Sequence, residues 1–444
     1  MTDWTPQSWR SSPAEQQPCY PDPARLQGVL QRLQTLPPLV APGAVAHLEG
    51  LLAEVAQGRR FLLQGGDCAE RFDDCREQAI ADKLKVLRQM SVVLTYGLRK
   101  PIVRVGRLAG QYAKPRSVAT EEVDGISLPV YRGDLVNDFA PTLARRVPDP
   151  DRMLQAYFHA AATLNYVRAL IEGGFADLHH PEHWDLGFIR ESERHREYSE
   201  IVGRILDAIS FMEACGSALE SALGRIDFFT SHEALVLPYE EALTRWDEAS
   251  SQYFNVGAHM LWVGNRTRAL EGAHVEYLRG IANPTGIKVG PTCAPDELPV
   301  LVRRINPENR WGRVTLITRL GADRVGELLP PLIRAIQAED ARVLWSCDPM
   351  HGNSLRTAGG VKTRDFEQIL GELRETYAIH QANDSRLGGV HFELTGDDVT
   401  ECLGGARRLA EADLQANYST YCDPRLNDEQ SLEMAFLIAG WNSR

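Results

Sequence analysis

The sequence predicts an α/β fold in which eight parallel strands close into a (β/α)8 TIM barrel. Short apolar runs rich in β-branched residues recur along the chain, and segments with helical periodicity separate them. Each run is apolar at nearly every position, which is typical of parallel strands with helices on both faces. Eight such runs in 444 residues match one barrel with additional helices.

Each predicted strand ends in glycine or in a polar residue. The eight strands are expected at Arg60–Asp67, Pro101–Arg107, Asp227–Glu233, His259–Asn265, Gly286–Thr292, Arg313–Gly321, Arg342–His351 and Gly389–Gly396. Helices are expected between them at Glu77–Tyr96, Leu298–Ile305, Val325–Gln337 and Arg364–Tyr377.

Two groups of helical segments lie outside this repeat. One precedes the first strand, at Pro23–Leu36 and Ala44–Gln57, and the other follows the second strand, at Met153–Glu172 and Glu197–Leu223. We therefore expect an N-terminal extension over residues 1–58 and a barrel catalytic domain over 59–444, with a helical insertion at about 140–225. Extra helices of this kind serve oligomer contacts or regulation, or they cover exposed barrel surface.

The composition is that of a globular protein and excludes several classes of partner. Hydrophobic residues make up 43% of the chain and charged residues 24%, and no apolar run is long enough to span a membrane. The net charge of −12 argues against nucleic acid or an anionic membrane as a partner. The eight cysteines form no CxxC pair, and the N-terminus lacks the character of a signal peptide. We therefore expect free thiols and a location in the cytoplasm.

Ionisable residues gather where the predicted strands end. Active sites of barrels lie at the carboxyl ends of the strands, so these positions decide the function. A barrel without a site would not collect them, because each buried charge must be paired or solvated. The residues are Asp67, Cys68, Arg107, Asn265, Arg266, Lys288, Arg319, Asp348, His351 and Glu393.

A metal site is predicted from four residues far apart in the chain. Cys68, His351 and Glu393, with Asp423 after the last strand, would supply one sulfur, one nitrogen and two oxygen ligands. This mixed set suits Mn²⁺, Co²⁺, Fe²⁺ or Zn²⁺ better than Mg²⁺ or Ca²⁺. Each residue alone also has a structural explanation, such as a small packing cysteine, so the prediction depends on the barrel that brings all four together.

Basic residues at the same rim predict phosphate binding. Arginine offers a bidentate fork to phosphate, and lysine a compact point charge. Lys288 lies inside an otherwise apolar strand, where a lysine needs an anionic partner. Two separate groups suggest two phosphates, although charged rims are often only solvated. The cations are Arg107, Lys114, Arg116, Arg266, Lys288 and Arg319.

Seven segments together closely resemble the type II (plant and microbial) 3-deoxy-D-arabino-heptulosonate 7-phosphate (DAHP) synthases, which open the shikimate pathway. They occur in consistent order over nearly the whole chain. The segments are Gln64–Phe72 (QGGDCAERF), Val105–Ser117 (VGRLAGQYAKPRS), Ser231–Glu240 (SHEALVLPYE), Gly286–Thr292 (GIKVGPT), Cys347–Asn353 (CDPMHGN), His391–Gly405 (HFELTGDDVTECLGG) and Cys422–Glu433 (CDPRLNDEQSLE).

The resemblance implies metal-dependent condensation of phosphoenolpyruvate with erythrose 4-phosphate and water to give DAHP and phosphate. Its residues then fall into three groups. The metal ligands are Cys68, His351, Glu393 and Asp423; the phosphoenolpyruvate site is Arg107, Asn265, Arg266, Lys288 and Arg319; the erythrose 4-phosphate site is Lys114, Arg116 and Ser117. The expected metal is Mn²⁺ or Co²⁺, with Fe²⁺, Zn²⁺ and Cd²⁺ as alternatives.

Lys114, Lys288 and His351 are the expected catalytic residues, and either Lys114 or a metal-bound water is expected to protonate the new hydroxyl group. The chain departs from the family at Asn265, where members commonly carry glutamate before the arginine. If that position acts through its backbone N–H, the change is tolerable. If the carboxylate orients Arg266 or a water, turnover or substrate preference differs.

Other functions fit parts of this pattern. A paralogue of the same chemistry would serve a secondary-metabolite pathway, of the phenazine or aminoshikimate type. A non-catalytic barrel would bind phosphorylated ligands without turnover, and a class II aldolase would release no phosphate. The expected partners are a homo-oligomer, dimer or tetramer, and a chorismate mutase.

Overall fold

Eight parallel strands form a closed barrel in the computed structural model, which describes residues 4–123, 125–173, 195–214 and 227–443. Neighbouring strands follow the order β1-β14-β11-β10-β9-β8-β5-β2 around the barrel. The strands are β1 (Phe61–Gly66), β2 (Ile102–Arg107), β5 (Phe228–Glu233), β8 (Met260–Val263), β9 (Thr285–Val289), β10 (Val314–Thr318), β11 (Leu344–Cys347) and β14 (Leu387–Glu393). All eight lie within or next to the runs predicted as strands, so the predicted barrel is confirmed.

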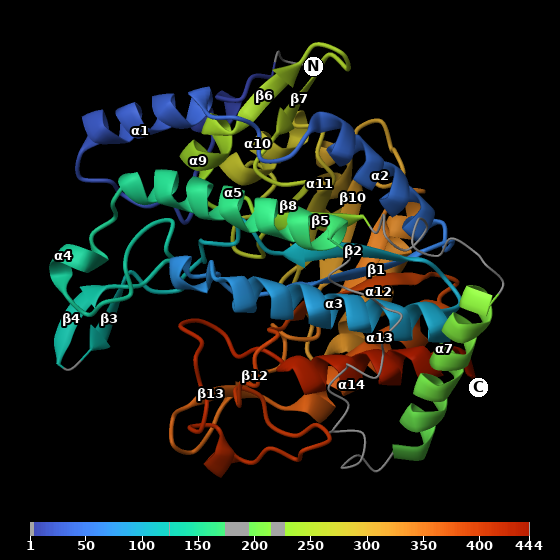
Figure 1. Cartoon of the computed structure of the whole chain (residues 1–444). Helices are drawn as coiled ribbons and strands as arrows, with labels where there is room; N and C mark the ends of the chain where they lie inside the picture. The colour runs from blue at the N-terminus through green and yellow to red at the C-terminus, as the bar shows by residue number, and fades with distance from the viewer. Residues whose placement is uncertain (1–3, 124, 174–194, 215–226, 444) are drawn as a thin grey trace.

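Helices surround the barrel (Figure 1). Local sequence defines several of their starts: the Asp365 side chain accepts the N–H of Gln368 at the start of α13, and Asn427 forms a capping box with Gln430 at the start of α14. The helices are α3 (Glu77–Leu98), α9 (Leu237–Ala242), α10 (Ala273–Gly280), α11 (Glu297–Ile305), α12 (Val325–Ala338), α13 (Phe366–Ala382) and α14 (Asp428–Ala439). The four helices predicted between strands are confirmed.

The N-terminal part of the chain closes the amino end of the barrel. It contains a 3-10 turn (Ser8–Ser11), α1 (Pro23–Thr35) and α2 (Pro42–Ala56). Leu48, Leu52 and Val55 of α2 are completely buried and pack in one cluster with Leu62, Val103, Phe229, Met260 and Leu344 from the strands. Figure 1 shows α2 on the side of the barrel opposite β3 (Thr120–Val123) and β4 (Ile126–Pro129), two strands that follow the carboxyl end of β2. The helix therefore fills the end that faces away from the strands' carboxyl ends.

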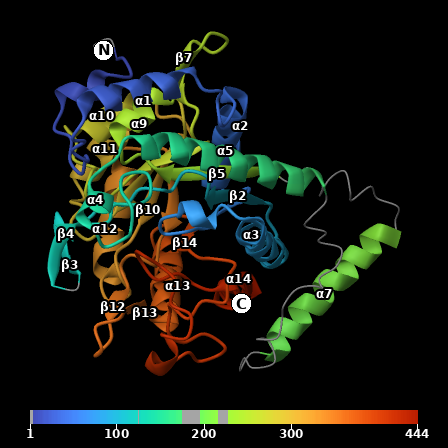
Figure 2. The ribbon, with the colours of Figure 1, turned by 60° about the vertical axis from the view of Figure 1, so that its left-hand side comes forward.

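The predicted insertion after β2 contains α4 (Leu143–Arg146), α5 (Asp151–Glu172) and α7 (His195–Ala214). Helix α7 lies outside α3 and α14 (Figure 2). Its Tyr198 stacks on Phe436 of α14, with 4.8 Å between the ring centroids. The helix expected at Glu197–Leu223 is thus present as far as Ala214, and its last nine residues lie outside the described chain. The domain boundaries at 58 and 59 stay a prediction.

Three two-stranded hairpins were not predicted. They are β3–β4 (Thr120–Val123 and Ile126–Pro129), β6–β7 (Thr244–Asp247 and Gln252–Asn255) and β12–β13 (Ser354–Arg356 and Lys362–Arg364). Their strands are only three or four residues long, too short for an alternating apolar pattern to identify them. None of the described helices is both long and apolar enough to cross a membrane.

Side chains inside the barrel form layers that become more polar toward the carboxyl ends. Strand residues alternate between the inside and the outside, so every second residue points inward. Along β14 and β1, Gly389 pairs with Leu62 in the apolar layer, His391 with Gln64 in a polar layer, and Glu393 with Gly66 at the rim. The His391 and Gln64 side chains are hydrogen-bonded at 2.8 Å. The barrel therefore has an apolar amino end and a charged carboxyl end.

Shortening Leu52 of α2 to alanine should open a cavity at the amino end of the barrel, because this side chain is completely buried. We expect the free energy of unfolding to fall by about 2–5 kcal/mol, with a lower midpoint in calorimetry. Leu143→Ala is the control, since Leu143 is 61% exposed. Equal effects of the two substitutions would contradict the packing role of α2.

Candidate functional site

A pocket of about 550 Å³ opens at the carboxyl ends of the barrel strands. All twelve residues predicted as ligands or substrate contacts line it: Cys68, Arg107, Lys114, Arg116, Ser117, Asn265, Arg266, Lys288, Arg319, His351, Glu393 and Asp423. Eight lysines and arginines and three carboxylates are among the lining residues. The pocket is therefore strongly cationic in a protein whose net charge is −12.

The strand register brings Arg107 and Glu393 together. Gly66 lies opposite Glu393 on β14 and opposite Arg107 on β2, so three strand ends meet at one level of the rim. A side chain at Gly66 would clash with the Arg107 main chain, and the φ of 143° at Gly66 also favours glycine. The Arg107 guanidinium donates to Glu393 Oε1 at 3.0 Å and to the Cys68 carbonyl at 3.2 Å.

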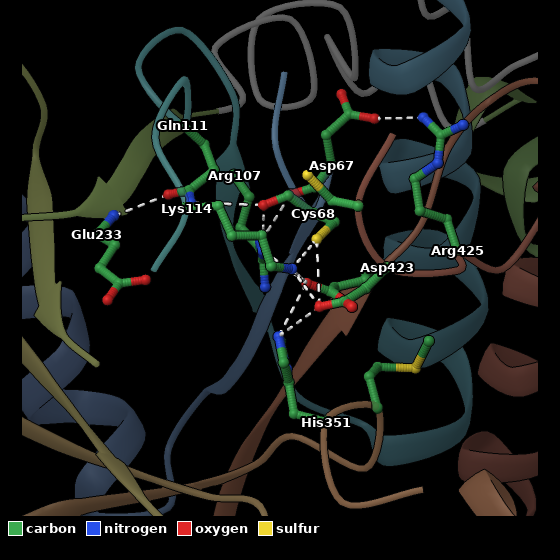
Figure 3. Close-up of polar contacts among 12 residues, drawn as sticks. Asp67, Cys68, Arg107, Gln111, Lys114, Glu233, His351, Asp423 and Arg425 are labelled. Atoms are coloured by element: carbon green, nitrogen blue, oxygen red, sulfur yellow. Dashed lines mark hydrogen bonds and ion pairs between the residues drawn. The ribbon is translucent and has the colours of Figure 1, made fainter. Parts of the chain in front are cut away.

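The four predicted metal ligands converge on one point, and Figure 3 shows three of them, Cys68, His351 and Asp423, directed toward one another. Ligand atoms of Cys68, Glu393 and Asp423 all lie within 4.8 Å of one another, and the three residues are buried. His351 Nε2 lies 3.0 Å from Glu393 Oε1 and 3.9 Å from Asp423 Oδ2. The arrangement thus presents sulfur, nitrogen and oxygen atoms to a common centre, although the residues come from four distant segments.

Lysine and arginine side chains balance the charge of this cluster. The Lys114 ammonium contacts Cys68 Sγ and Asp423 Oδ2, and it lies 3.9 Å from Glu393 Oε1. Arg364, which is completely buried, lies 2.7 Å from Glu393 Oε2. A cationic group therefore occupies the centre of the donor set.

Burial and neighbouring charge act in opposite directions on these carboxyl groups. Burial alone would raise the pKa of Glu393, but His351, Lys114 and Arg364 hold it well below its ordinary value. The same opposition, dominated by Lys114, holds the pKa of Asp423 well below its ordinary value. Burial raises the pKa of the Cys68 thiol well above its usual range. Both carboxylates are thus ionised, and the thiol needs a cation to become a thiolate.

Asp348 holds His351 and Lys288 in place. Its carboxylate contacts the Lys288 ammonium, lies 2.7 Å from His351 Nδ1 and accepts the backbone N–H of Met350 at 3.0 Å. The Nε2 atom of His351 is thereby directed toward Glu393, in the way that metal-binding histidines are commonly oriented through their second nitrogen. Burial lowers the pKa of Lys288 to about 8, although Asp348 opposes that effect.

Three arginines of the pocket, Arg266, Arg319 and Arg356, have no carboxylate partner within 4 Å among the described residues. Arg266 is exposed and donates to Ser117 Oγ at 2.8 Å, while Arg319 donates to the His351 carbonyl at 2.6 Å. Arg116 has a distant partner, with 3.4 Å between its guanidinium and Glu121 Oε2. These guanidinium groups can therefore accept an anion without first breaking a close ion pair.

Asn265 has a structural role between two strand ends. Its side-chain oxygen accepts the N–H of Gly290 at 3.0 Å and lies 3.4 Å from Arg268 Nε. A side chain at Gly290 would collide with the Asn265 amide. The side-chain amide of Asn265 therefore joins the end of β9 to the loop after β8. This structural role holds whether the position acts in catalysis through its backbone N–H or through its side chain.

Some residues around the pocket were not singled out from the sequence. Glu233, at the end of β5, has an Oε1 atom without a hydrogen-bond partner among the described residues, and burial raises its pKa. Lys362 of the β12–β13 hairpin contacts Asp423 Oδ1. Glu233 is the last residue of a predicted strand. Strand alternation, which directs every second side chain into the barrel, could therefore have identified it. Lys362 and Arg364 lie in a hairpin that the sequence pattern did not mark.

Glu401 is a further residue that sequence reasoning missed, and it holds the segment that carries Asp423. Its completely buried carboxylate accepts the N–H groups of Thr420 and Arg425, both at 2.8 Å. The Arg425 guanidinium contacts Glu401 and also Asp67, in each case at 2.8 Å (Figure 3 shows the Asp67 contact). Through Arg425, the segment after β14 is thus connected to Asp67, which lies between the end of β1 and Cys68.

Comparisons with known proteins show which proteins this chain is similar to. The chain matches the model of the class-II DAHP synthetase family over residues 4–439. It is 49% identical over 452 residues to a phospho-2-dehydro-3-deoxyheptonate aldolase of Neurospora crassa, covering 98% of this chain and 94% of the relative. The protein of that name from Streptomyces coelicolor is 48% identical, covering 97% of this chain and 96% of the relative. The phospho-2-dehydro-3-deoxyheptonate aldolase AroG of Mycolicibacterium smegmatis is 46% identical, covering 97% and 92%.

Replacing Glu401 by alanine should leave the Arg425 guanidinium and several backbone N–H groups buried without an acceptor. We expect the free energy of unfolding to fall by about 3–5 kcal/mol, measured by urea titration. Glu411→Ala, at an exposed position of the following loop, serves as the control. A loss below about 1 kcal/mol for Glu401→Ala would show that the segment does not depend on this carboxylate.

Proposed function

The chain belongs to the class-II DAHP synthetase family and has phospho-2-dehydro-3-deoxyheptonate aldolase activity, and from that premise we propose that the pocket at the barrel mouth is the active site. In it, phosphoenolpyruvate condenses with erythrose 4-phosphate and water to give DAHP and inorganic phosphate. One observation carries the proposal: eight basic side chains line a pocket around a buried set of sulfur, nitrogen and oxygen donors. Such a pocket suits two phosphorylated substrates and one cation.

Members of the family depend on a divalent metal, and the residues present fit one. Cys68, Glu393 and Asp423 form a buried group of donors, and the position among them already holds the positive charge of Lys114. His351 supplies a nitrogen that Asp348 orients. We propose that these four residues hold Mn²⁺ or Co²⁺, with Fe²⁺, Zn²⁺ and Cd²⁺ as alternatives. When bound, the ion supplies Lewis-acid polarisation of the aldehyde oxygen.

The two phosphates are assigned to two groups of cations. Arg266, Lys288 and Arg319 would bind the phosphate of phosphoenolpyruvate, since Arg266 and Arg319 lack carboxylate partners and Lys288 lies at the pocket floor. Arg107, beneath them, contacts Glu393 and would face the carboxylate end of the substrate. Asn265 would hold the loop that carries Arg266.

The second group lies in the loop after β2. Lys114, Arg116 and Ser117 all line the pocket, with Lys114 against Cys68 and Asp423 and Ser117 exposed. The Ser117 hydroxyl contacts Arg266. We assign Lys114, Arg116 and Ser117 to the phosphorylated aldehyde. This assignment places the aldehyde carbon between these three residues and the phosphoenolpyruvate site, where the new carbon–carbon bond must form.

The reaction then follows from these positions. Carbon 3 of phosphoenolpyruvate attacks the aldehyde carbon, and Lys114 donates a proton to the aldehyde oxygen as it becomes a hydroxyl. Carbon 2 becomes electron-poor and is captured by water, whose proton passes to Glu233 through its unpartnered Oε1. The hydroxyl group at carbon 2 gives its proton to the departing phosphate as the carbon–oxygen bond to phosphate breaks, which leaves a ketone and hydrogen phosphate. The cations retain this phosphate.

Neighbouring charge matters for the proposed role of Lys114. Burial alone would lower its pKa, but Asp423, Cys68 and Glu393 raise it above its ordinary value. The raised pKa of Lys114 requires that the carboxylates of Asp423 and Glu393 are not bound to another cation. We therefore expect Lys114 to release its proton more readily when Asp423 and Glu393 are engaged by a metal ion.

Several expectations from the sequence stay predictions. They are a homo-oligomer, a chorismate mutase partner and a cytoplasmic location. A paralogue in a secondary-metabolite pathway is the second candidate function, because Asn265 stands where the family commonly has glutamate. Comparing turnover of erythrose 4-phosphate with turnover of its imino analogue separates the two.

The proposed reaction predicts metal-dependent release of inorganic phosphate only when both substrates are present. Chelation should abolish it, and Mn²⁺ or Co²⁺ should restore it. His351→Ala should reduce turnover at least about 100-fold and weaken metal binding, because one donor atom is lost. His47→Ala, at an exposed histidine, should behave like the wild type. Unchanged phosphate release from a metal-free His351→Ala protein would refute the proposal, and condensation without phosphate release would indicate a class II aldolase.

The pKa of Lys288 predicts a pH dependence of phosphoenolpyruvate binding. Burial holds this pKa at about 8, so the ammonium loses its proton, and its attraction for phosphate, as the pH rises through that value. With a single titrating group, KM for phosphoenolpyruvate should rise about fivefold between pH 8 and pH 9.

Lys288→Met is the matched test, because methionine has similar length and no charge. This variant should show a raised KM for phosphoenolpyruvate at pH 7 and little further change up to pH 9. Parallel pH profiles for the two proteins would show that another group titrates.

A further inference from the structure

The N-terminal arm, defined here as residues 4–17, is fastened to the side of the barrel mouth. Trp9 Nε1 donates to the buried carboxylate of Glu241 at 2.9 Å, and Arg10 contacts both of its oxygens at 2.9 and 3.0 Å. Trp4 donates to the Glu276 carbonyl at 2.9 Å. Glu241 and Glu276 belong to α9 and α10, so the arm is fixed to the helices that follow β5 and β8.

The end of the arm reaches the loop that follows β5. Gln17 accepts the N–H of Leu237 at 3.0 Å and donates to the carbonyl of Leu235 at 2.8 Å. These residues come directly after Glu233, which lines the pocket. The backbone on either side of Gln16 is therefore held by contacts that do not involve Gln16 itself.

Gln16 has a backbone conformation that few residues with a side chain adopt. Its φ is 61°, in the left-handed region. In this conformation its side-chain oxygen accepts the backbone N–H of Arg116 at 2.9 Å, and its carbonyl accepts from Arg132 at 2.9 Å. Gln16 thus contacts the loop after β2, at a residue that lies 100 positions later in the sequence.

That loop has few other supports at this point. Lys114 donates its N–H to the Arg132 carbonyl, and the next backbone contact is the Ala119 carbonyl, which accepts from Val130. Among the described residues, no other hydrogen bond reaches the main chain from Pro115 to Val118. The Gln16 oxygen is consequently what fixes the backbone between Lys114 and the β3–β4 hairpin.

We propose that Gln16 is a positioning residue for the aldehyde substrate: the N-terminal arm uses its side-chain oxygen to hold Arg116 and Ser117 in the conformation that binds the aldehyde's phosphate. This inference rests on the proposed function, in which these two residues receive erythrose 4-phosphate. Arg107, Lys288 and Arg319 are on or directly after barrel strands and do not depend on the arm. Of the phosphoenolpyruvate group, Arg266 touches this loop, through Ser117 Oγ at 2.8 Å. The arm therefore acts chiefly on the aldehyde substrate and has a smaller effect on phosphoenolpyruvate.

The physical reason is pre-organisation. A loop that samples several conformations binds its ligand more weakly, in proportion to the fraction of time spent in the competent one. Removing a single hydrogen bond of average strength reduces that population about fivefold. We expect the loss to appear in KM for erythrose 4-phosphate.

The test compares three variants of the full chain. Gln16→Gly removes the acceptor but tolerates a positive φ, so the backbone itself is not strained. Gln16→Glu keeps an oxygen acceptor and should restore the contact. Gln7→Ala removes a contact of the arm to Glu241 that does not touch the loop, and serves as the control.

Two measurements are made on each variant: hydrogen exchange of the peptide that contains Arg116 and Ser117, and KM for each substrate with kcat. Gln16→Gly should exchange faster in this peptide and show an approximately fivefold higher KM for erythrose 4-phosphate, with KM for phosphoenolpyruvate within about twofold of wild type. Gln16→Glu and Gln7→Ala should behave like the wild type in both measurements.

Unchanged exchange, or faster exchange without a change in KM for erythrose 4-phosphate, would overturn the role of Gln16. An equal rise in KM for both substrates would also overturn it, because it would indicate a general structural defect. Ser117→Ala in the same assay tests the underlying assignment. If Ser117→Ala leaves KM for erythrose 4-phosphate unchanged, the proposed function of the loop fails, whatever the exchange of Gln16→Gly.

Discussion

The buried carboxylate of Glu393 is the group on which the arrangement of the barrel mouth depends. It lies at the end of β14 without solvent exposure, and three cationic side chains lie around it: Arg107 at 3.0 Å, Arg364 at 2.7 Å and Lys114 at 3.9 Å. An ionised carboxylate in this position would be very unfavourable without such partners. Compensation of this one charge therefore determines which side chains occupy the pocket floor.

That compensation also explains why the site is built from distant segments. A single strand end offers one or two side chains to the rim, so balancing Glu393 and Asp423 requires contributions from β2, the loop after it and the β12–β13 hairpin. The same requirement connects the surroundings: Arg425 links Glu401 to Asp67, and Asp348 links Lys288 to His351. Loss of one member would leave its partner buried with an unbalanced charge, so the network constrains many positions together.

The barrel and most of the site were predictable because their physical signals are local or periodic. Strands buried on both faces, such as Val314–Thr318, appear as continuous apolar runs, and the barrel rule then places strand-end residues at one rim. Lys288 was noticeable because a lysine in an apolar strand needs a partner. That partner was not predicted: Asp348 was recognised as a strand-end residue, but its contact with Lys288 depends on a register between β9, β10 and β11 that composition does not contain.

The sequence by itself determined the fold class and the charged rim, since these depend on strand periodicity and residue type, and the resemblance to a known family completed the set of twelve residues that meet in the pocket. Tertiary structure alone decided how the site is held. Arg364 and Lys362 lie in a short polar hairpin without an apolar pattern, and Glu401 acts through backbone N–H groups that no side-chain motif reveals. Gln16 reaches Arg116 only because the arm is fastened to α9 and α10. Contacts of this kind depend on packing between distant segments, whereas periodicity records only which face of its own element a residue occupies.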